Sequence, residues 1–272
     1  MIPFLKWPGG KRWFVANHSS LFPVRYGRYV EPFLGDGSVY FHLQPKRALL
    51  GDINEELIAT YVTVRDHWRS IVKLLNEHQA EHSKKHYYRT RKTEPKNPIE
   101  MAARFIYLNR TCFNGIYRVN RLGEFNVPKG TKNTVVLDDD DFRAIASQLQ
   151  TAEIRKSDFE DLIDEAIRGD FVFADPPYTV SHSNNGFIKY NEKLFSWGDQ
   201  IRLSGALTRA RDRGVNIVLT NANHGSVREL YTKSGFAVKT VSRFSSISAD
   251  AQGRKQFEEL IAVASPKRIS LP

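Results

Sequence analysis

The chain has 272 residues, and 40 lysines and arginines against 30 aspartates and glutamates give it a formal net charge of +10. Its single cysteine, Cys112, excludes an intramolecular disulfide and a cysteine-rich zinc site. No stretch approaches 18 apolar residues, and the opening MIPFLKWPGGKRW lacks the pattern of a signal peptide, so we expect a soluble, cytoplasmic protein without a membrane partner. The positive charge favours a polyanionic partner such as nucleic acid, although a merely basic surface would have the same composition.

Four short apolar runs predict buried strands, at Tyr29–Val30, Ala48–Leu50, Phe171–Ala174 and Val215–Thr220. Polar or acidic residues follow the first three at once, among them Glu31, Asp52 and Asp175. In an open parallel sheet the ligand crevice lies beyond the carboxyl ends of the strands, which is where these acids would fall. The pattern therefore predicts an α/β sheet with a ligand site at that edge.

Helical patterns lie between these runs. Apolar residues three or four apart predict a helix from about residue 57 to 75, Pro98 begins another, and Ser196 with Asp199 forms a capping signal for a third helix that ends near Gly214. The stretch from 78 to 98 is polar and strongly basic. We therefore interpret residues 56–136 as a domain inserted into a second one formed by residues 1–55 and 137–272.

Asp175, Pro176, Pro177 and Tyr178 directly follow the third predicted strand. An amino group conjugated to an aromatic ring is a poor nucleophile, because its lone pair is delocalised. A carboxylate and a rigid backbone carbonyl that both accept hydrogen bonds from this group localise the lone pair and stabilise the charge that develops on attack. Asp175 and the Pro176 carbonyl suit that role, and the Tyr178 ring could stack on a base. The competing interpretation is an ordinary Pro-Pro turn.

The segment Glu31–Ser38 places a Gly-x-Gly turn after the first predicted strand, and the second strand ends at Asp52. Glycines allow a backbone to approach a ligand closely, and an acid at the end of the next strand can bind both ribose hydroxyls. Because the turn contains no basic residue, it favours a nucleoside-like cofactor without phosphates.

These segments resemble the Dam-type (D12 class) DNA adenine-N6 methyltransferases over nearly the whole chain and in the same order. The matching segments are Lys6–Lys11, Glu31–Gly37, Asp52–Asn54, Asn109–Arg118, Gly123–Pro128, the Asp175–Tyr178 motif, and Arg254–Lys255 with Glu258–Leu260. The resemblance implies a Rossmann-like methyltransferase sheet with an inserted, mainly helical target-recognition domain that carries a β-hairpin, on residues 56–136. It also implies a bacterial or phage enzyme, Dam-like or from a restriction-modification system.

The implied reaction transfers a methyl group from S-adenosylmethionine, without a metal, to N6 of an adenine flipped out of duplex DNA, within GATC. No obligate protein partner is implied. The implied catalytic residues are Asp175, Pro176, Pro177 and Tyr178. The implied cofactor-binding residues are Trp7, Lys11, Phe33, Gly35, Asp52, Asp158, Phe159 and Asp175. The implied DNA-binding residues are Lys6, Phe113, Asn114, Ile116, Arg118, Asn126 and Pro128.

The resemblance also implies individual roles on the DNA. Phe113 falls on an aromatic residue that inserts beside the vacated position, and Asn114 falls on the residue that contacts the orphaned thymine. Arg118 falls on a guanine-contacting arginine and Lys6 on the residue that contacts the outer guanine. Ile116 and Pro128 occupy positions that pack against thymine. Pro8 and Asp36 depart from the usual small residues at their positions, but neither departure removes a group that the chemistry needs.

Several alternatives remain open. His78–His82 has the H-x-x-E-H spacing of one class of zinc peptidase, although a solvated helix face is the simpler interpretation. The basic run Lys84–Lys96 could contact phosphates or could be plain surface. A methyltransferase that acts on RNA or on another exocyclic amine, and a catalytically silent DNA-binding regulator, are the alternative functions.

Overall fold

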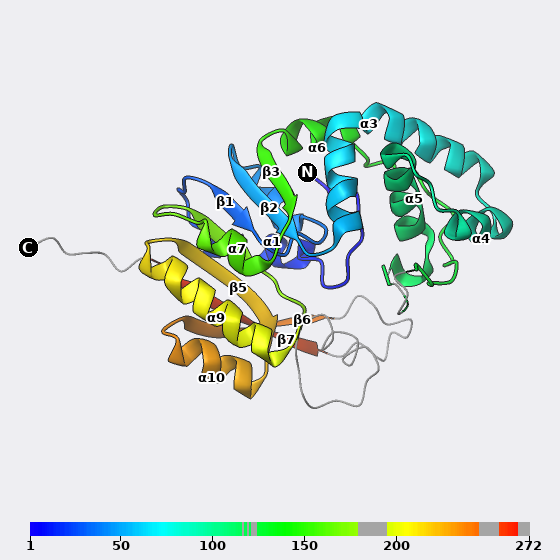
Figure 1. The fold of residues 1–272 in the computed structure, drawn as a ribbon. Helices are drawn as coiled ribbons and strands as arrows, with labels where there is room; N and C mark the ends of the chain where they lie inside the picture. The colour runs from blue at the N-terminus through cyan, green and yellow to red at the C-terminus, as the bar shows by residue number, and fades with distance from the viewer. Residues whose placement is uncertain (116, 119, 121–123, 179–194, 245–255, 266–272) are drawn as a thin grey trace, which may run out of the picture. The chain divides into compact units, whose positions relative to one another are not determined.

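The computed structural model describes residues 1–115, 117–118, 120, 124–178, 195–244 and 256–265 (Figure 1). Contacts divide the chain into two compact units. Unit 1 consists of Met1–Ser19 and Leu34–Lys156, and unit 2 of Ser20–Phe33 and Ser157–Pro272. Among the described residues, no helix combines the length and apolar character needed to cross a membrane.

Unit 1 is mainly helical and carries two strands. Its elements are α1 (Arg12–His18), α2 (Ser38–Leu43), β2 (Ala48–Asp52), α3 (Glu55–Glu81), α4 (Lys84–Lys92), α5 (Pro98–Thr111), η2 (Phe113–Gly115), α6 (Phe142–Leu149) and β3 (Ala152–Lys156). The two strands are parallel, in register from Ala48 opposite Ala152 to Asp52 opposite Lys156. The carboxyl end of β2 therefore presents Asp52, as predicted.

Local capping fixes where the long helices of unit 1 begin. The Asn54 side chain accepts a hydrogen bond from the Leu57 amide at the start of α3, and Asn97 does the same for Ile99 at the start of α5, where Pro98 occupies the first turn. Helix α3 packs against both α5 and α6. The predicted helices from residues 57 and 98 are thus confirmed, and α3 runs further than predicted.

Unit 2 contains five neighbouring strands of one sheet. Its elements are β1 (Tyr29–Glu31), α7 (Phe159–Asp164), β4 (Phe171–Ala174), α9 (Trp197–Asp212), β5 (Asn216–Ala222), α10 (Gly225–Lys233), β6 (Ala237–Phe244) and β7 (Gln256–Ala264), and the short helix η1 (Ser19–Leu21) leads into it. The strand order is β1-β4-β5-β7-β6. Strands β1, β4 and β5 are parallel, whereas β7 is antiparallel to both of its neighbours.

The strand predictions are confirmed with small changes of boundary. Strand β5 begins one residue later than predicted and continues to Ala222. At the start of α9, Ser196 and Asp199 form the predicted reciprocal capping box. Parallel strands that alternate with helices confirm the α/β, Rossmann-like class. The boundaries of the two units differ from those of the predicted catalytic and recognition domains. The division into those two functional domains stays a prediction.

Candidate active site

The glycine turn of unit 1 depends on its glycines. Gly35 and Gly37 have φ values of +49° and +65°, in the left-handed region that favours glycine. A Cβ on Gly35 would lie 2.9 Å from the Trp7 ring. Asp36 is buried and accepts hydrogen bonds from the Ser38 amide (3.1 Å) and hydroxyl (2.7 Å). The family departure at Asp36 thus stabilises the start of α2.

Asp52 is held directly beside this turn. Its Oδ2 accepts a hydrogen bond from the Gly35 amide (3.2 Å) and its Oδ1 from the Asn54 amide (3.0 Å). Burial raises the pKa of the Asp52 carboxyl above its ordinary value, and the backbone donors act in the opposite direction. Each carboxylate oxygen can accept a further bond, so Asp52 can serve as an acceptor for hydroxyl groups.

The N-terminal segment packs on the same turn. A Cβ on Gly10 would lie 2.6 Å from Asp36 Oδ2, which explains why a glycine stands there. Lys11 is buried and its Nζ donates to the Gly9 carbonyl (2.7 Å). Four predicted cofactor-binding residues of unit 1 therefore belong to one connected group, which we call the Asp52 group: Trp7, Lys11, Gly35 and Asp52.

In unit 2, the Asp175 motif continues directly from β4. Pro176 is buried, and Asp175, Pro177 and Tyr178 are half-buried. The Thr220 hydroxyl, at the carboxyl end of the adjacent strand β5, donates to Asp175 Oδ1 (2.7 Å). The motif therefore presents its acid at the edge of the sheet where the sequence places it.

Phe33 and Phe159, two further predicted cofactor-binding residues, stack on one another in unit 2. Their ring centroids lie 5.4 Å apart at an interplanar angle of 25°, and Phe195 contacts both rings. Phe159 is buried, whereas Phe33 is only half-buried. Of this stacked pair, Phe33 thus offers more ring surface to a planar ligand.

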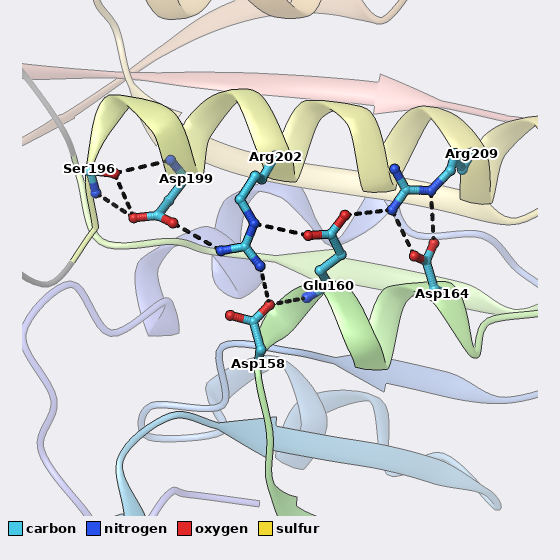
Figure 2. Close-up of polar contacts among 7 residues, drawn as sticks. All are labelled: Asp158, Glu160, Asp164, Ser196, Asp199, Arg202 and Arg209. Atoms are coloured by element: carbon cyan, nitrogen blue, oxygen red, sulfur yellow. Dashed lines mark hydrogen bonds and ion pairs between the residues drawn. The ribbon is translucent and has the colours of Figure 1, made fainter.

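Asp158 is restrained by an arginine of α9 (Figure 2). Its Oδ1 accepts from the Glu160 amide (2.9 Å), as the cap of α7, and from Arg202 (2.8 Å). The Arg202 guanidinium also lies 4.8 Å from the centroid of the Phe159 ring and pairs with Glu160 and Asp199. One arginine therefore contacts both members of the predicted Asp158–Phe159 pair.

A second arginine of α9 repeats part of this pattern further along the helix (Figure 2). Arg209 pairs with Glu160 (2.8 Å) and Asp164 (2.7 Å) of α7. Its hydrogen bonds hold the pKa of both carboxyls below their ordinary values. These ion pairs are exposed, so each is worth about 1 kcal/mol or less.

Antiparallel backbone pairing in unit 1 joins the predicted DNA-binding segments. The Phe113 amide donates to the Pro128 carbonyl (2.9 Å), and the Asn126 amide donates to the Arg118 carbonyl (3.3 Å). Arg118 also donates to the Asn126 side chain (3.3 Å). Phe113 is 52% exposed, and Asn114 beside it has a φ of +58°. The predicted insertion residue is thus accessible, while Ile116 lies outside the described residues.

Lys6 is fixed against this region by Asn109. The Asn109 side chain accepts from the Lys6 amide (2.9 Å) and donates to the Lys6 carbonyl (2.7 Å). The next residue, Arg110, donates to the Phe4 carbonyl and forms a buried ion pair with Asp140. Burial, reinforced by Lys132 and by Arg110, lowers the pKa of Lys6 to about 8. The backbone of this predicted guanine-contacting lysine is therefore fixed by hydrogen bonds, and its side-chain amine loses its proton at a lower pH than an ordinary lysine does.

Tyr117 connects the recognition segment, by which we mean the described residues between Phe113 and Pro128, to the Asp52 group. Its ring stacks on Trp7, with centroids 5.7 Å apart and an interplanar angle of 17°, and its hydroxyl bonds to Glu56. Phe105 of α5 stacks on Trp7 as well. Tyr117, which directly precedes the predicted DNA-binding residue Arg118, thus contacts the predicted cofactor-binding residue Trp7.

Comparison with known proteins decides the family. Residues 7–247 match the family model of the D12 class N6 adenine-specific DNA methyltransferases. The chain belongs to this family. It is therefore an enzyme, and the resemblance found in the sequence is confirmed.

Curated relatives match the methyltransferase over almost its full length. Type II methyltransferase M1.LlaDCHI of Lactococcus lactis subsp. cremoris is 35% identical, over 95% of this chain and 94% of that protein. Type II methyltransferase M.MjaIII of Methanocaldococcus jannaschii is 34% identical, over 93% of this chain and 95% of that protein. The DNA adenine methylase of Escherichia coli K12 is 30% identical, over 98% of this chain and 96% of that protein.

The histidines of the methyltransferase's H-x-x-E-H segment do not form a solvated face. His78 stacks on Tyr107 with centroids 4.5 Å apart, and its Nδ1 lies 2.9 Å from His86 Nε2. His82 Nδ1 lies 2.9 Å from the Tyr107 hydroxyl. Burial lowers the pKa of His78 to about 4. The expectation of a solvated face was wrong because Tyr107 of α5 packs there, and no metal-ligating group of three or more side chains occurs among the described residues.

Three residues of the methyltransferase were not recognised from its sequence as supports of the site. Thr220 could have been suspected, because a hydroxyl residue there directly follows the apolar residues Ile217, Val218 and Leu219. Asn109 belongs to a matched motif but carried no assigned role. For Arg202 the sequence offers no signal, because its contacts depend on how α7 and α9 pack.

Proposed function

We propose that this methyltransferase transfers a methyl group from S-adenosylmethionine to N6 of adenine within GATC sites of duplex DNA. The observation that carries the proposal is the Asp175–Tyr178 motif at the carboxyl end of β4, with Asp175 hydrogen-bonded by Thr220. The names of the curated relatives, which include DNA adenine methylases and type II methyltransferases, support the same reaction in a Dam-like or restriction-modification setting.

The predicted cofactor-binding residues have side chains that suit a nucleoside cofactor without phosphates. In the Asp52 group, the Asp52 carboxylate suits the ribose hydroxyls. In unit 2, the exposed part of Phe33 suits the adenine ring, with Phe159 behind it and Asp158 fixed beside it by Arg202. We propose that the Asp52 group, Phe33, Asp158, Phe159 and Asp175 each contribute to binding S-adenosylmethionine. When bound, the cofactor supplies an electrophilic methyl group on a sulfonium sulfur.

Asp175 and the Pro176 carbonyl act on the amino group of the target. By accepting hydrogen bonds from N6, they localise its lone pair and stabilise the positive charge that develops on nitrogen. The N6 lone pair would then bond to the methyl group that the cofactor supplies, with the neutral thioether as the leaving group, and an N6 proton would pass to water. Two prolines restrict the backbone, so these acceptors need little reorganisation.

The target adenine must leave the duplex to reach these groups. Tyr178 would stack on the flipped base, and Phe113 would fill the vacated position. The exposure of Phe113 supports this role. Asn114 would contact the orphaned thymine.

Contacts from the recognition segment and the N-terminal segment would select the site. Arg118 would contact guanine O6 and N7, and Lys6 the outer guanine. Pro128 and Ile116 would pack against thymine, and Asn126 would orient Arg118 through their hydrogen bond. Lysines and arginines of α4, such as Lys84, would add phosphate contacts.

Transfer of labelled methyl from S-adenosylmethionine to two duplexes tests the proposal. One duplex contains GATC, and the other has the same bases scrambled. Label on GATC alone supports the reaction and the site together. Label on both would overturn the specificity, and label on neither, with the duplex bound, would favour an RNA substrate or a regulatory role.

A further inference from the structure

Strand register brings Thr220 to Asp175. Strands β4 and β5 are parallel, and their last paired residues are Ala174 and Leu219. Asp175 and Thr220 each come one residue later, so they face each other where β4 ends. The Thr220 hydroxyl donates to Asp175 Oδ1 at 2.7 Å, an ordinary distance for an O–H···O hydrogen bond.

The Thr220 hydroxyl has a fixed position. Thr220 is fully buried, and its β-branched side chain has few accessible rotamers. Its strand is flanked on both sides, because β7 pairs with β5 and places Ile261 opposite Thr220. A donor with this little freedom can set the orientation of the group that it contacts.

The residue after Thr220 anchors the end of the strand. Asn221 is fully buried, and its Nδ2 donates to Gln200 Oε1 (3.2 Å) while its Oδ1 accepts from the Ala222 amide (2.8 Å). Gln200 Oε1 also accepts from the Tyr231 hydroxyl (3.2 Å). This buried polar network joins α9 and α10 to the end of β5, and it restrains the backbone that carries Thr220.

Strand packing alone gives no reason for a hydroxyl at this position. The three residues before Thr220 are the buried apolar Ile217, Val218 and Leu219, and valine has nearly the shape of threonine. A buried hydroxyl costs free energy unless it is hydrogen-bonded. The Thr220 hydroxyl is hydrogen-bonded to Asp175, the residue that, under the proposed function, accepts a hydrogen bond from the amino group being methylated.

We propose that Thr220 is a positioning residue for methyl transfer, whose buried hydroxyl fixes the Asp175 carboxylate in the orientation that accepts a hydrogen bond from the amino group being methylated. This inference rests on the proposed function. A carboxylate has about four lone-pair sites, so Asp175 can accept from Thr220 and from the substrate together. Fixing it in advance lowers the barrier, because misplacement by about 1 Å can cost on the order of 100-fold in rate.

The test compares Thr220→Val, Thr220→Ala and Thr220→Ser in the full-length chain. Single-turnover methyl transfer to a GATC duplex, equilibrium affinity for the duplex and for S-adenosylmethionine, and thermal unfolding are measured for each. Thr63→Val is the matched control, because Thr63 is also a buried threonine and its hydroxyl donates to the Ala59 carbonyl of its own helix.

We expect Thr220→Val and Thr220→Ala to slow methyl transfer about 10- to 100-fold with duplex affinity unchanged. Thr220→Ser, which keeps the donor, should remain within a few-fold of the unmodified rate, as should Thr63→Val. The inference is overturned if a folded Thr220→Val or Thr220→Ala variant keeps the full rate, or if Thr220→Ser is as slow as they are. An unmodified chain that methylates no adenine would overturn the proposed function itself, which distinguishes the two failures.

Discussion

The Asp175 motif and the recognition segment hold their functional side chains in different ways. Asp175 is bonded by a buried side chain of a neighbouring strand. In the recognition segment, the pairing of Phe113 with Pro128 is made by backbone atoms, and the Phe113 ring is exposed. The proposed catalytic acid is thus held by the sheet, while the side chain of the proposed insertion residue is exposed. Substitutions in the first region should change rate, and those in the second should change selectivity.

Asp175→Ala should give the largest effect. Without its carboxylate acceptor, methyl transfer to GATC should fall by at least about 100- to 1000-fold. Duplex affinity should stay within a few-fold, since phosphate contacts supply most of it. Labelled-methyl transfer and a duplex binding titration measure the two quantities. Substantial turnover by this variant would contradict the assignment of Asp175.

Arg118→Ala should change selectivity and leave the chemistry intact. Loss of a bidentate guanine contact should relax discrimination at one guanine by roughly 1–3 kcal/mol. To measure this discrimination, kcat/KM for the GATC duplex is divided by kcat/KM for duplexes in which one base pair of the site is substituted at a time. If the preference stays the same at every position, Arg118 has no role in guanine recognition.

Arg202→Ala should weaken cofactor binding, because Arg202 fixes Asp158 and lies on Phe159. We expect the Kd for S-adenosylmethionine to rise about 3- to 10-fold, on the order of 1 kcal/mol. Arg209→Ala is the matched control, since the two side chains are 45% and 47% exposed and both pair with Glu160. Calorimetric titration of both variants should show the rise for Arg202 alone, and equal Kd values would refute its role.

The smallest effect concerns pH. With the pKa of Lys6 lowered to about 8, its ammonium is present below that pH and is lost as the pH rises through it. Discrimination at the outer guanine should therefore fall a few-fold between about pH 7 and pH 9. The kcat/KM ratio reports the free enzyme and is the quantity to follow. Lys6→Arg, which stays charged, should abolish the pH dependence, whereas a flat profile in the unmodified chain would exclude Lys6 titration.

Features that depend on neighbouring residues could be predicted from the sequence. The capping box from Ser196 to Asp199 spans four residues, and the acids at the carboxyl ends of β2 and β4 follow apolar runs whose ends are evident. The family motifs marked the same positions. These predictions needed only periodicity, turn chemistry and the rule that parallel sheets place ligands at the carboxyl ends of their strands.

Features that depend on distant pairing could not be predicted. The Thr220–Asp175 bond follows from the register of β4 against β5, and the Asn109–Lys6 pair joins residues 103 positions apart. The histidines near residue 80 were misjudged because their partner, Tyr107, belongs to another helix. A pattern along one helix indicates which side is polar, but it does not tell what will pack there.

The position of β7 has a consequence for folding. Among the described strands β7 comes last in the sequence, yet it lies between β5 and β6, so the edge that each of them presents to β7 is unpaired until residues 256–264 arrive. During synthesis, unit 2 would therefore expose two strand edges of the kind that promotes aggregation. The strand that carries Thr220 gains its second neighbour only at this step. Chaperone demand should accordingly be greatest just before the C-terminal strand leaves the ribosome.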